Sequence, residues 1–186
     1  AKLEAIFYAA GSVKGFAEPF LKNNVKVVSA WQANAVPVAE FTLGQIILSM
    51  KSYFRNTMDC RSPEKRHKGG CTRGPGLYGE TVGLIGCGMI AKLLIKLLKN
   101  FHLKIAVFDP FMSEETAKSL GVEKMSLEDL FKKAFVVSNH LPDLPETRGM
   151  LKGHLFASMR QGATFINTGR GAQIVESEFI DRKSVV

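Results

Sequence analysis

The feature that most constrains the fold is a glycine-rich turn between a strand pattern and a helix pattern. Residues 81–85 form a compact apolar run, and Gly86-Cys87-Gly88-Met89-Ile90-Ala91 follows it directly. From Ile90 to Leu98, Leu and Ile recur at helical spacing. The turn has the form G-x-G-x-x-A, a dinucleotide-binding fingerprint with alanine at the third glycine position. The context therefore predicts a strand–turn–helix unit that binds a dinucleotide; the alternative is a tight turn without a ligand.

Each small residue of the turn has a separate predicted role. Gly86 permits the tight turn, Gly88 lets the backbone approach a pyrophosphate, and Ala91 keeps helix and strand close. The first helical residues, Met89 and Ile90, are expected to face the anion, because a helix amino terminus carries partial positive charge.

Asp109 is the predicted contact to the adenosine ribose. It follows the strand pattern of residues 104–108 and stands 18 residues after Ala91, the separation typical of this fold. A carboxylate there accepts hydrogen bonds from the ribose hydroxyls and repels a 2′-phosphate, which favours NAD over NADP. The alternative is a turn-forming Asp before Pro110.

Strand and helix patterns alternate along most of the chain, which predicts an α/β fold with a doubly wound, Rossmann-like parallel sheet. A helix from Val36 to Tyr53, after Pro37, and two earlier strands at 5–10 and 26–29 indicate a second unit. We place the boundary so that residues 1–29 belong to that unit and residues 30–186 to the dinucleotide-binding domain. The remaining predicted strands are 81–85, 104–108, 135–138 and 163–167, and the remaining predicted helices are 90–98, 114–120, 126–130, 155–159 and 176–180.

Composition excludes several other classes. No apolar run reaches the roughly 18 residues of a membrane span. The three cysteines lack a C-x-x-C pair, so neither a disulfide framework nor a metal site is indicated and a reducing cytoplasm is expected.

The net charge of +8 permits an acidic partner without identifying one. The most basic stretch lacks interleaved aromatic residues, so we interpret residues 61–79 as a solvated loop and expect no nucleic-acid binding. Its cations are Arg61, Lys65, Arg66, Lys68 and Arg73.

Several motifs, in order, resemble the D-isomer-specific 2-hydroxyacid dehydrogenases, including the phosphoglycerate dehydrogenase-like members. They are residues 83–91, His140-Leu141-Pro142 with Glu146-Thr147, and Asn167-Thr168-Gly169-Arg170-Gly171. Upstream, residues 10–13 resemble the family's substrate-carboxylate loop, and Asn34 with residues 38–40 resembles its interdomain, dimer-forming helix.

The resemblance implies NAD-dependent interconversion of a 2-oxo acid and a D-2-hydroxy acid. It further implies that residues 1–29 are the remnant of a flavodoxin-like substrate domain and that the helix starting near Val36 forms a homodimer. By resemblance, Gly11, Ser12 and Val13 bind the substrate. The implied cofactor contacts in the second half of the chain are Leu141, Pro142, Thr147, Thr168, Gly169 and Arg170.

Arg170 is the residue that the resemblance assigns to catalysis. In the family, this arginine holds the substrate carboxylate and polarises the 2-oxo group. A guanidinium suits that role, because it offers paired donors and stays charged. The alternative is an arginine paired with a surface acid.

The family also uses a histidine and a glutamate that both follow this arginine. The four histidines, at 67, 102, 140 and 154, all precede Arg170. His140 is expected to have a structural or cofactor-edge role, and we expect this polypeptide alone to be inactive in hydride transfer. Residues 181–186 break the preceding helix pattern, and we interpret them as non-native sequence at a truncation.

Three other functions are the alternatives to this one. One is a dinucleotide-sensing corepressor or scaffold, since the family resemblance includes such members. A second is a basic nucleic-acid-binding module. A third is the β-hydroxyacid dehydrogenase family, which has a similar glycine turn but places it at the amino terminus. The particular acid is not indicated by the sequence.

Overall fold

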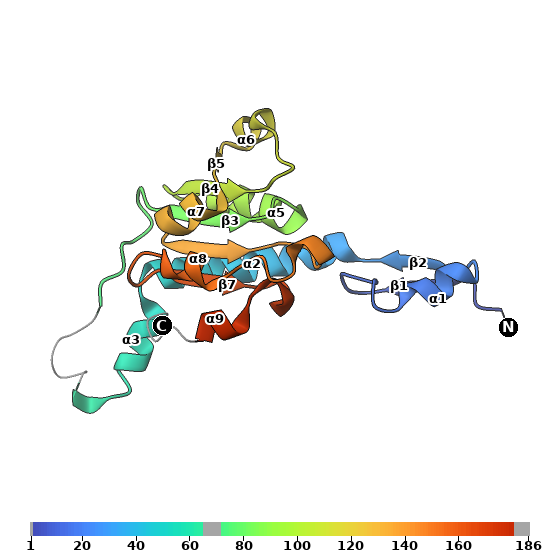
Figure 1. The fold of residues 1–186 in the computed structure, drawn as a ribbon, viewed down its shortest axis with the longest axis horizontal. Helices are drawn as coiled ribbons and strands as arrows, with labels where there is room; N and C mark the ends of the chain where they lie inside the picture. Colours follow the sequence, from blue (N-terminus) through green and yellow to red (C-terminus); the bar gives the residue numbers. More distant parts are fainter. Residues whose placement is uncertain (1, 65–71, 181–186) are drawn as a thin grey trace.

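A five-stranded parallel sheet forms the centre of the computed structural model, which describes residues 2–64 and 72–180 (Figure 1). The strand order is β5-β4-β3-β6-β7, so the chain moves outward from β3 in both directions. This is the predicted doubly wound, Rossmann-like arrangement. The strands are β3 (Thr81–Ile85), β4 (Lys104–Phe108), β5 (Glu123–Lys124), β6 (Val136–Asn139) and β7 (Thr164–Asn167).

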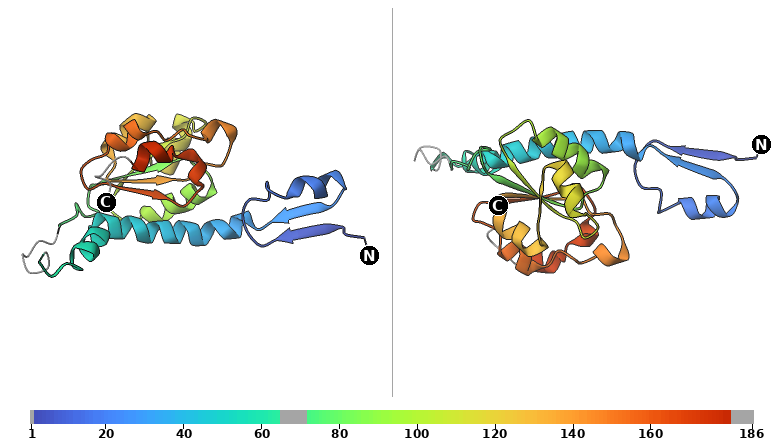
Figure 2. Two further views of the ribbon diagram at one scale, coloured as in Figure 1. Left: turned by 60° about the horizontal axis from the view of Figure 1, so that its bottom comes forward. Right: turned by 90° about the horizontal axis from the view of Figure 1, so that it is seen from above.

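Helices cover both faces of the sheet, as Figure 2 shows from two directions. On one face lie α2 (Trp31–Met50) and α5 (Met89–Leu98), which also pack against each other. On the other face lie α7 (Leu127–Lys133) and α8 (Gly153–Ala157), with α9 (Glu176–Ile180) packed on α8. Burial on both faces explains why the inner strands are apolar at successive positions rather than alternate ones.

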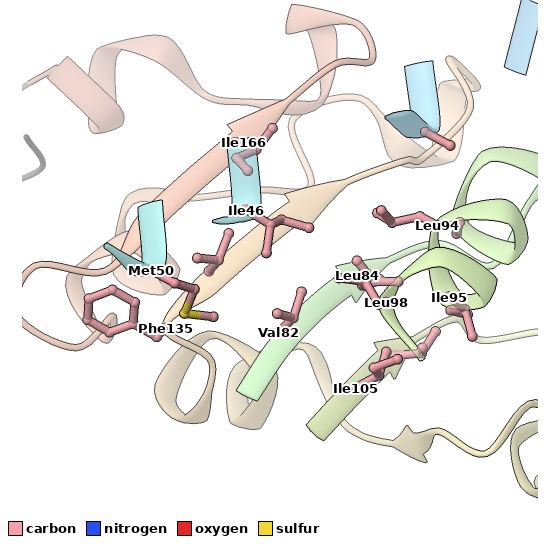
Figure 3. Close-up of a cluster of buried hydrophobic side chains, with 14 of the residues drawn as sticks. Ile46, Met50, Val82, Leu84, Leu94, Ile95, Leu98, Ile105, Phe135 and Ile166 are labelled. Carbon is pink, nitrogen blue, oxygen red and sulfur yellow. The ribbon is translucent and has the colours of Figure 1, made fainter. Parts of the chain in front are cut away.

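The larger core cluster lies between the sheet and the pair α2 and α5 (Figure 3). Ile46 and Met50 of α2 meet Leu84 and Val82 of β3 together with Leu94 of α5, and all five side chains are fully buried. This packing attaches α2 to the dinucleotide-binding domain along its second half.

Two short helices, which pack on opposite faces of the sheet, begin at serine N-caps. Ser113 accepts a hydrogen bond from the Thr116 backbone N–H at the start of α6 (Glu114–Leu120), and Gly121 ends that helix with φ +61°. Ser126 accepts from the Asp129 N–H in the same way at the start of α7. These serines satisfy amide donors that the first helical turn leaves free.

The predicted start and end of the long helix were wrong. It begins at Trp31, so Pro37 lies inside it, and it ends at Met50. Proline costs the helix one hydrogen bond, and the packing of α2 on the sheet and α5 outweighs that cost. Ser52, in the left-handed conformation with φ 53°, then separates α2 from α3 (Tyr53–Asp59), which the sequence analysis did not predict.

Residues 5–29 form a small separate sheet at the amino-terminal end of α2 (Figure 1). Strands β1 (Ala5–Tyr8) and β2 (Lys26–Ser29) form a parallel pair, and α1 (Ala17–Lys22) lies in the connection between them. Phe7 and Val28 are register partners and are both exposed. The boundary at residue 30 stays a prediction, although β2 passes directly into α2 there.

Within the described residues, no helix is both long and apolar enough to cross a membrane. The predicted non-native residues 181–186, and Lys65, Arg66 and Lys68 of the basic stretch, lie outside the described residues.

The packing of α7 on β3 generates a stability prediction. A Cβ at Gly83 would lie 2.5 Å from Leu130 Cδ2 and 3.0 Å from the Ala134 Cβ. Gly83→Ala is expected to lower the free energy of unfolding by about 1–3 kcal/mol, the usual cost of overpacking. Gly44→Ala, in α2 with open space around its Cβ, is the matched control and is expected to raise it by up to about 1 kcal/mol. Urea denaturation of both variants measures the difference, and equal effects would contradict close packing at Gly83.

Candidate functional site

The predicted glycine turn lies at the carboxyl end of β3, next to the end of β6. Gly86 has φ +88°, and a Cβ on it would lie 3.1 Å from the His140 carbonyl oxygen. Its N–H donates to the Phe108 carbonyl at 2.7 Å, which ties the turn to the end of β4. Both the backbone conformation and the lack of space therefore require glycine at position 86.

Gly88 meets a different requirement. Its φ of −75° is open to any residue, and a Cβ there would have no heavy atom within 4 Å. It precedes α5, whose N-cap makes no side-chain hydrogen bond, so the N–H groups of the first turn, including those of Met89 and Ile90, are uncapped. Ala91, one residue further, is fully buried. Open space in front of uncapped N–H donors is a suitable place for an anion.

Asp109 lies over the same turn. Its Oδ2 accepts a hydrogen bond from the Cys87 N–H at 2.7 Å, and its Oδ1 accepts from the Phe111 N–H at 2.8 Å. The carboxylate thus stabilises its own turn while it holds the glycine turn in place. Burial raises the pKa of the Cys87 thiol, and the charge of Asp109 raises it further. The thiol consequently stays uncharged at neutral pH.

The ends of β6 and β7 are joined by two asparagines, neither of which was predicted as a site residue from the sequence. Asn139 and Asn167 are register partners, and Asn139 Nδ2 donates to Asn167 Oδ1 at 3.2 Å. Asn139 Oδ1 accepts from the Leu141 N–H at 3.2 Å. The available signal was a polar amide as the last residue of two neighbouring strands, since parallel strands end at one edge.

The predicted cofactor residues after β6 form a closed turn. Thr147, in η1 (Pro145–Thr147), donates from its Oγ1 to the Pro142 carbonyl at 2.7 Å and accepts from the Leu144 N–H at 3.1 Å. Gln173 is buried and was not predicted to have a role; its Nε2 donates to the same Pro142 carbonyl at 3.2 Å. Thr147 therefore shapes the loop that carries Leu141 and Pro142, and its contact to a cofactor stays a prediction.

The predicted residues after β7 are oriented by Asn167. Its Oδ1 accepts from the Gly169 N–H at 3.0 Å, and its Nδ2 donates to the Arg170 carbonyl at 3.3 Å. The Thr168 hydroxyl is buried and has no partner among the described atoms. Arg170 is exposed, and among residues 2–64 and 72–180 no acidic side chain forms an ion pair with it. The expected alternative, a pairing with a surface acid, is not seen there.

His140 lies half-buried at the same edge. Its Nε2 lies 3.0 Å from the Ser138 hydroxyl oxygen, and its Nδ1 has no partner among the described atoms. Burial lowers the pKa of His140 to about 4. The ring is therefore neutral at pH 7 and does not act as a charged proton donor at that pH.

The predicted substrate loop lies beside this edge. The carboxyl ends of β1 and β2 face those of the larger sheet (Figure 1). Lys14 Nζ lies 3.5 Å from the Asp143 carbonyl oxygen in the loop after β6. Gly11 faces Asn34 of α2, because a Cβ added to Gly11 would lie 3.3 Å from the Asn34 Nδ2. The Gly11 carbonyl oxygen accepts a hydrogen bond from the Ser29 hydroxyl. Residues 11–13 and the loop after β6 are thus neighbours.

The described residues contain no group of three or more His, Cys, Asp or Glu side chains that could hold a metal ion. The fold and the edge that carries the glycine turn together define a dinucleotide-binding domain of the Rossmann type.

Comparison with known proteins gives the family. Residues 43–182 match the model for "D-isomer specific 2-hydroxyacid dehydrogenase, NAD binding domain". The chain belongs to this family, which confirms the predicted resemblance, the NAD-binding domain and NAD as its cofactor.

Individual relatives agree with that assignment. D-3-phosphoglycerate dehydrogenase of Bacillus subtilis is 31% identical over 160 residues, which is 86% of this chain and 30% of that enzyme. The apo structure of D-lactate dehydrogenase from Escherichia coli matches with a TM-score of 0.73 and 29% identity over 96% of this chain and 56% of that chain. The structure of D-2-hydroxyisocaproate dehydrogenase shares the fold, with a TM-score of 0.81 at 23% identity over 96% of this chain and 53% of that one. The chain thus spans about a third to a half of these relatives.

The residues of the edge fit NAD. Gly88 leaves open space before uncapped helix N–H groups, and the Thr168 hydroxyl, directly after β7, has no hydrogen-bond partner in the part of the chain that the structure describes. A ligand that accepts hydrogen bonds from the N–H groups of α5 and forms a hydrogen bond with the Thr168 hydroxyl would satisfy both groups.

The contrast between the two glycines generates a prediction. Gly88→Ala is expected to lower the free energy of unfolding by no more than about 1 kcal/mol, because an added Cβ meets no atom within 4 Å and the cost is that of a poorer N-cap residue. The same change is expected to weaken NADH binding at least tenfold by filling the space before α5. Gly86→Ala is expected to lose about 1–3 kcal/mol of stability through its positive φ. Thermal denaturation and fluorescence titration measure the two effects. Unchanged NADH affinity in Gly88→Ala would show that the pyrophosphate binds elsewhere.

The burial of His140 generates a second prediction, on pH. Because its folded-state pKa of about 4 lies below the reference 6.5, the unfolded chain binds the proton more tightly, and stability falls as pH drops from about 6.5 toward 4. Between pH 7 and pH 5 this loss is on the order of 2 kcal/mol. In His140→Gln the fall over that interval is expected to be smaller by this amount, as measured by urea denaturation. The exposed His154→Gln controls for the loss of one histidine, and identical slopes in parent and His140→Gln would refute the assignment.

Proposed function

We propose that this chain supplies the NAD-binding half of an enzyme that interconverts a 2-oxo acid and a D-2-hydroxy acid. The observation that carries the proposal is the alignment of the open glycine turn after β3 with Arg170 after β7, which has no ion-pair partner among the described residues. Only β6 lies between these strands, so their ends are roughly 10 Å apart. That separation suits a dinucleotide whose pyrophosphate lies at Gly88 and whose nicotinamide lies near Arg170.

The roles of the individual residues follow from their chemistry. The N–H groups at Gly88, Met89 and Ile90 would bind the pyrophosphate, and Asp109 would accept from the adenosine ribose and disfavour a 2′-phosphate. The backbone of Leu141, Pro142, Thr168 and Gly169 would flank the nicotinamide. When bound, the nicotinamide supplies or accepts the hydride at C2 of the acid.

Arg170 and the loop at residues 11–13 would hold the substrate from two sides. The guanidinium would bind the carboxylate and stabilise negative charge on the substrate oxygen. The backbone N–H groups of Gly11, Ser12 and Val13 would bind the carboxylate from the smaller sheet. Proton transfer needs a further group, because His140 is neutral and bonded to Ser138 and none of the four histidines follows Arg170.

We further propose a homodimer formed through α2. Val36 and Phe41 of this helix are exposed apolar residues, which supports an association surface. A cytoplasmic location stays a prediction from cysteine usage.

Titration of this chain with NADH and then with pyruvate, a simple 2-oxo acid, tests the proposal. The parent is expected to bind NADH more tightly than NADPH, and pyruvate is expected to change the fluorescence of the bound NADH. In Arg170→Met the NADH affinity is expected to stay within about threefold of the parent. The affinity for pyruvate, measured from the fluorescence of the bound NADH, is expected to fall at least tenfold, because the substrate loses a hydrogen bond to a charged group. Arg148→Met, which removes a surface arginine paired with Asp143 at 3.0 Å, is the control. No binding of NADH by the folded parent would refute the proposal.

A further inference from the structure

Two side-chain amides, the fully buried Asn139 and the half-buried Asn167, connect the loop after β6 with the loop after β7. Asn139 has no exposed surface and bonds both the Leu141 N–H and the Asn167 side chain. Asn167 in turn bonds the Gly169 N–H and the Arg170 carbonyl. A second connection runs from Gln173, in η2 (Gly171–Gln173), to the Pro142 carbonyl. The two loops are therefore joined by side chains as well as by the strands beneath them.

The direction of these bonds makes the pair cooperative. The Oδ1 of Asn139 accepts from Leu141, so its Nδ2 must face Asn167 and requires an acceptor there. Asn167 meets that requirement with Oδ1, which leaves its Nδ2 for the Arg170 carbonyl. A flip of either amide would set N–H against N–H or oxygen against oxygen. Since an unpaired buried amide is costly, each side chain determines the orientation of the other.

We propose that Asn139 is a positioning residue that holds the Leu141 backbone and, through Asn167, the Gly169–Arg170 backbone in one fixed arrangement. This inference rests on the proposed function, in which the first loop flanks the nicotinamide and the second carries Arg170. Asn139 lies beneath both loops and acts through its two bonded neighbours. Its predicted effect is therefore confined to the nicotinamide half of the dinucleotide, because within residues 2–64 and 72–180 the Asn139 side chain makes no hydrogen bond to the glycine turn or to Asp109.

Three variants separate positioning from general stability. Asn139→Leu keeps a similar volume and removes every hydrogen bond of the amide. Asn139→Ser is smaller and polar, does not reach Asn167, and serves if the leucine variant fails to fold. Val137→Ala is the matched control, because Val137 is buried two residues earlier on the same face of β6 and makes no side-chain hydrogen bond.

Amide hydrogen exchange tests the coupling without any ligand. In Asn139→Leu or Asn139→Ser, exchange at Leu141 and at Gly169 is expected to rise at least tenfold relative to Val137→Ala. The change at Gly169 is the diagnostic one, because that residue belongs to the neighbouring strand's loop and is bonded to Asn167 rather than Asn139. Exchange at Gly169 equal to that of Val137→Ala would overturn the proposal.

Titration with NADH and with ADP-ribose, which lacks the nicotinamide, tests the consequence for binding. Both Asn139 variants are expected to bind NADH about tenfold more weakly than the parent and ADP-ribose within about twofold, whereas Val137→Ala affects both equally. If the Asn139 variants weaken both ligands equally, Asn139 is merely structural and this inference fails while the proposed function stands. If the folded parent binds neither ligand, the proposed function fails and this inference fails with it.

Discussion

The parallel register of the central sheet is the constraint on which the candidate site depends. Ile85 is paired with Phe108 on one side and with Asn139 on the other, and Asn139 is paired with Asn167. Strands β3, β4, β6 and β7 therefore end at one edge. Every loop with a predicted cofactor role follows one of these ends, so the strand register itself brings residues far apart in the chain together.

Backbone geometry at that edge largely determines the shape of the site. Gly86 turns the chain away from β3 against the His140 carbonyl, and Asp109 holds the next N–H of the turn. Gly88 then leaves space in front of α5. Ala91 is buried on the inner side of α5, and Ile46 and Met50 of α2 pack on β3. These contacts hold the glycine turn between β3 and α5 in place. The core thus positions the turn, and the turn leaves donors free for a ligand.

Sequence analysis worked where local chemistry decides the structure. The strand before Gly86 and the helices that begin after Ser113 and Ser126 follow from apolar pattern and short-range hydrogen bonding. It failed at Trp31, where tertiary packing extends the helix through Pro37, and at Ser52, where a left-handed residue divides two helices. No local pattern carries information about either outcome.

By itself, the sequence determined the strand–turn–helix unit, the acidic residue that follows it and the family, because each depends on residue types at short spacing. Only the tertiary structure decided that Asn139 and Asn167 share one hydrogen-bond chain, that burial makes His140 neutral, and that Arg170 has no acidic partner in the described part of the chain. These facts depend on strand register and on burial. Both are set by the free energy of packing the whole domain, which no short segment specifies.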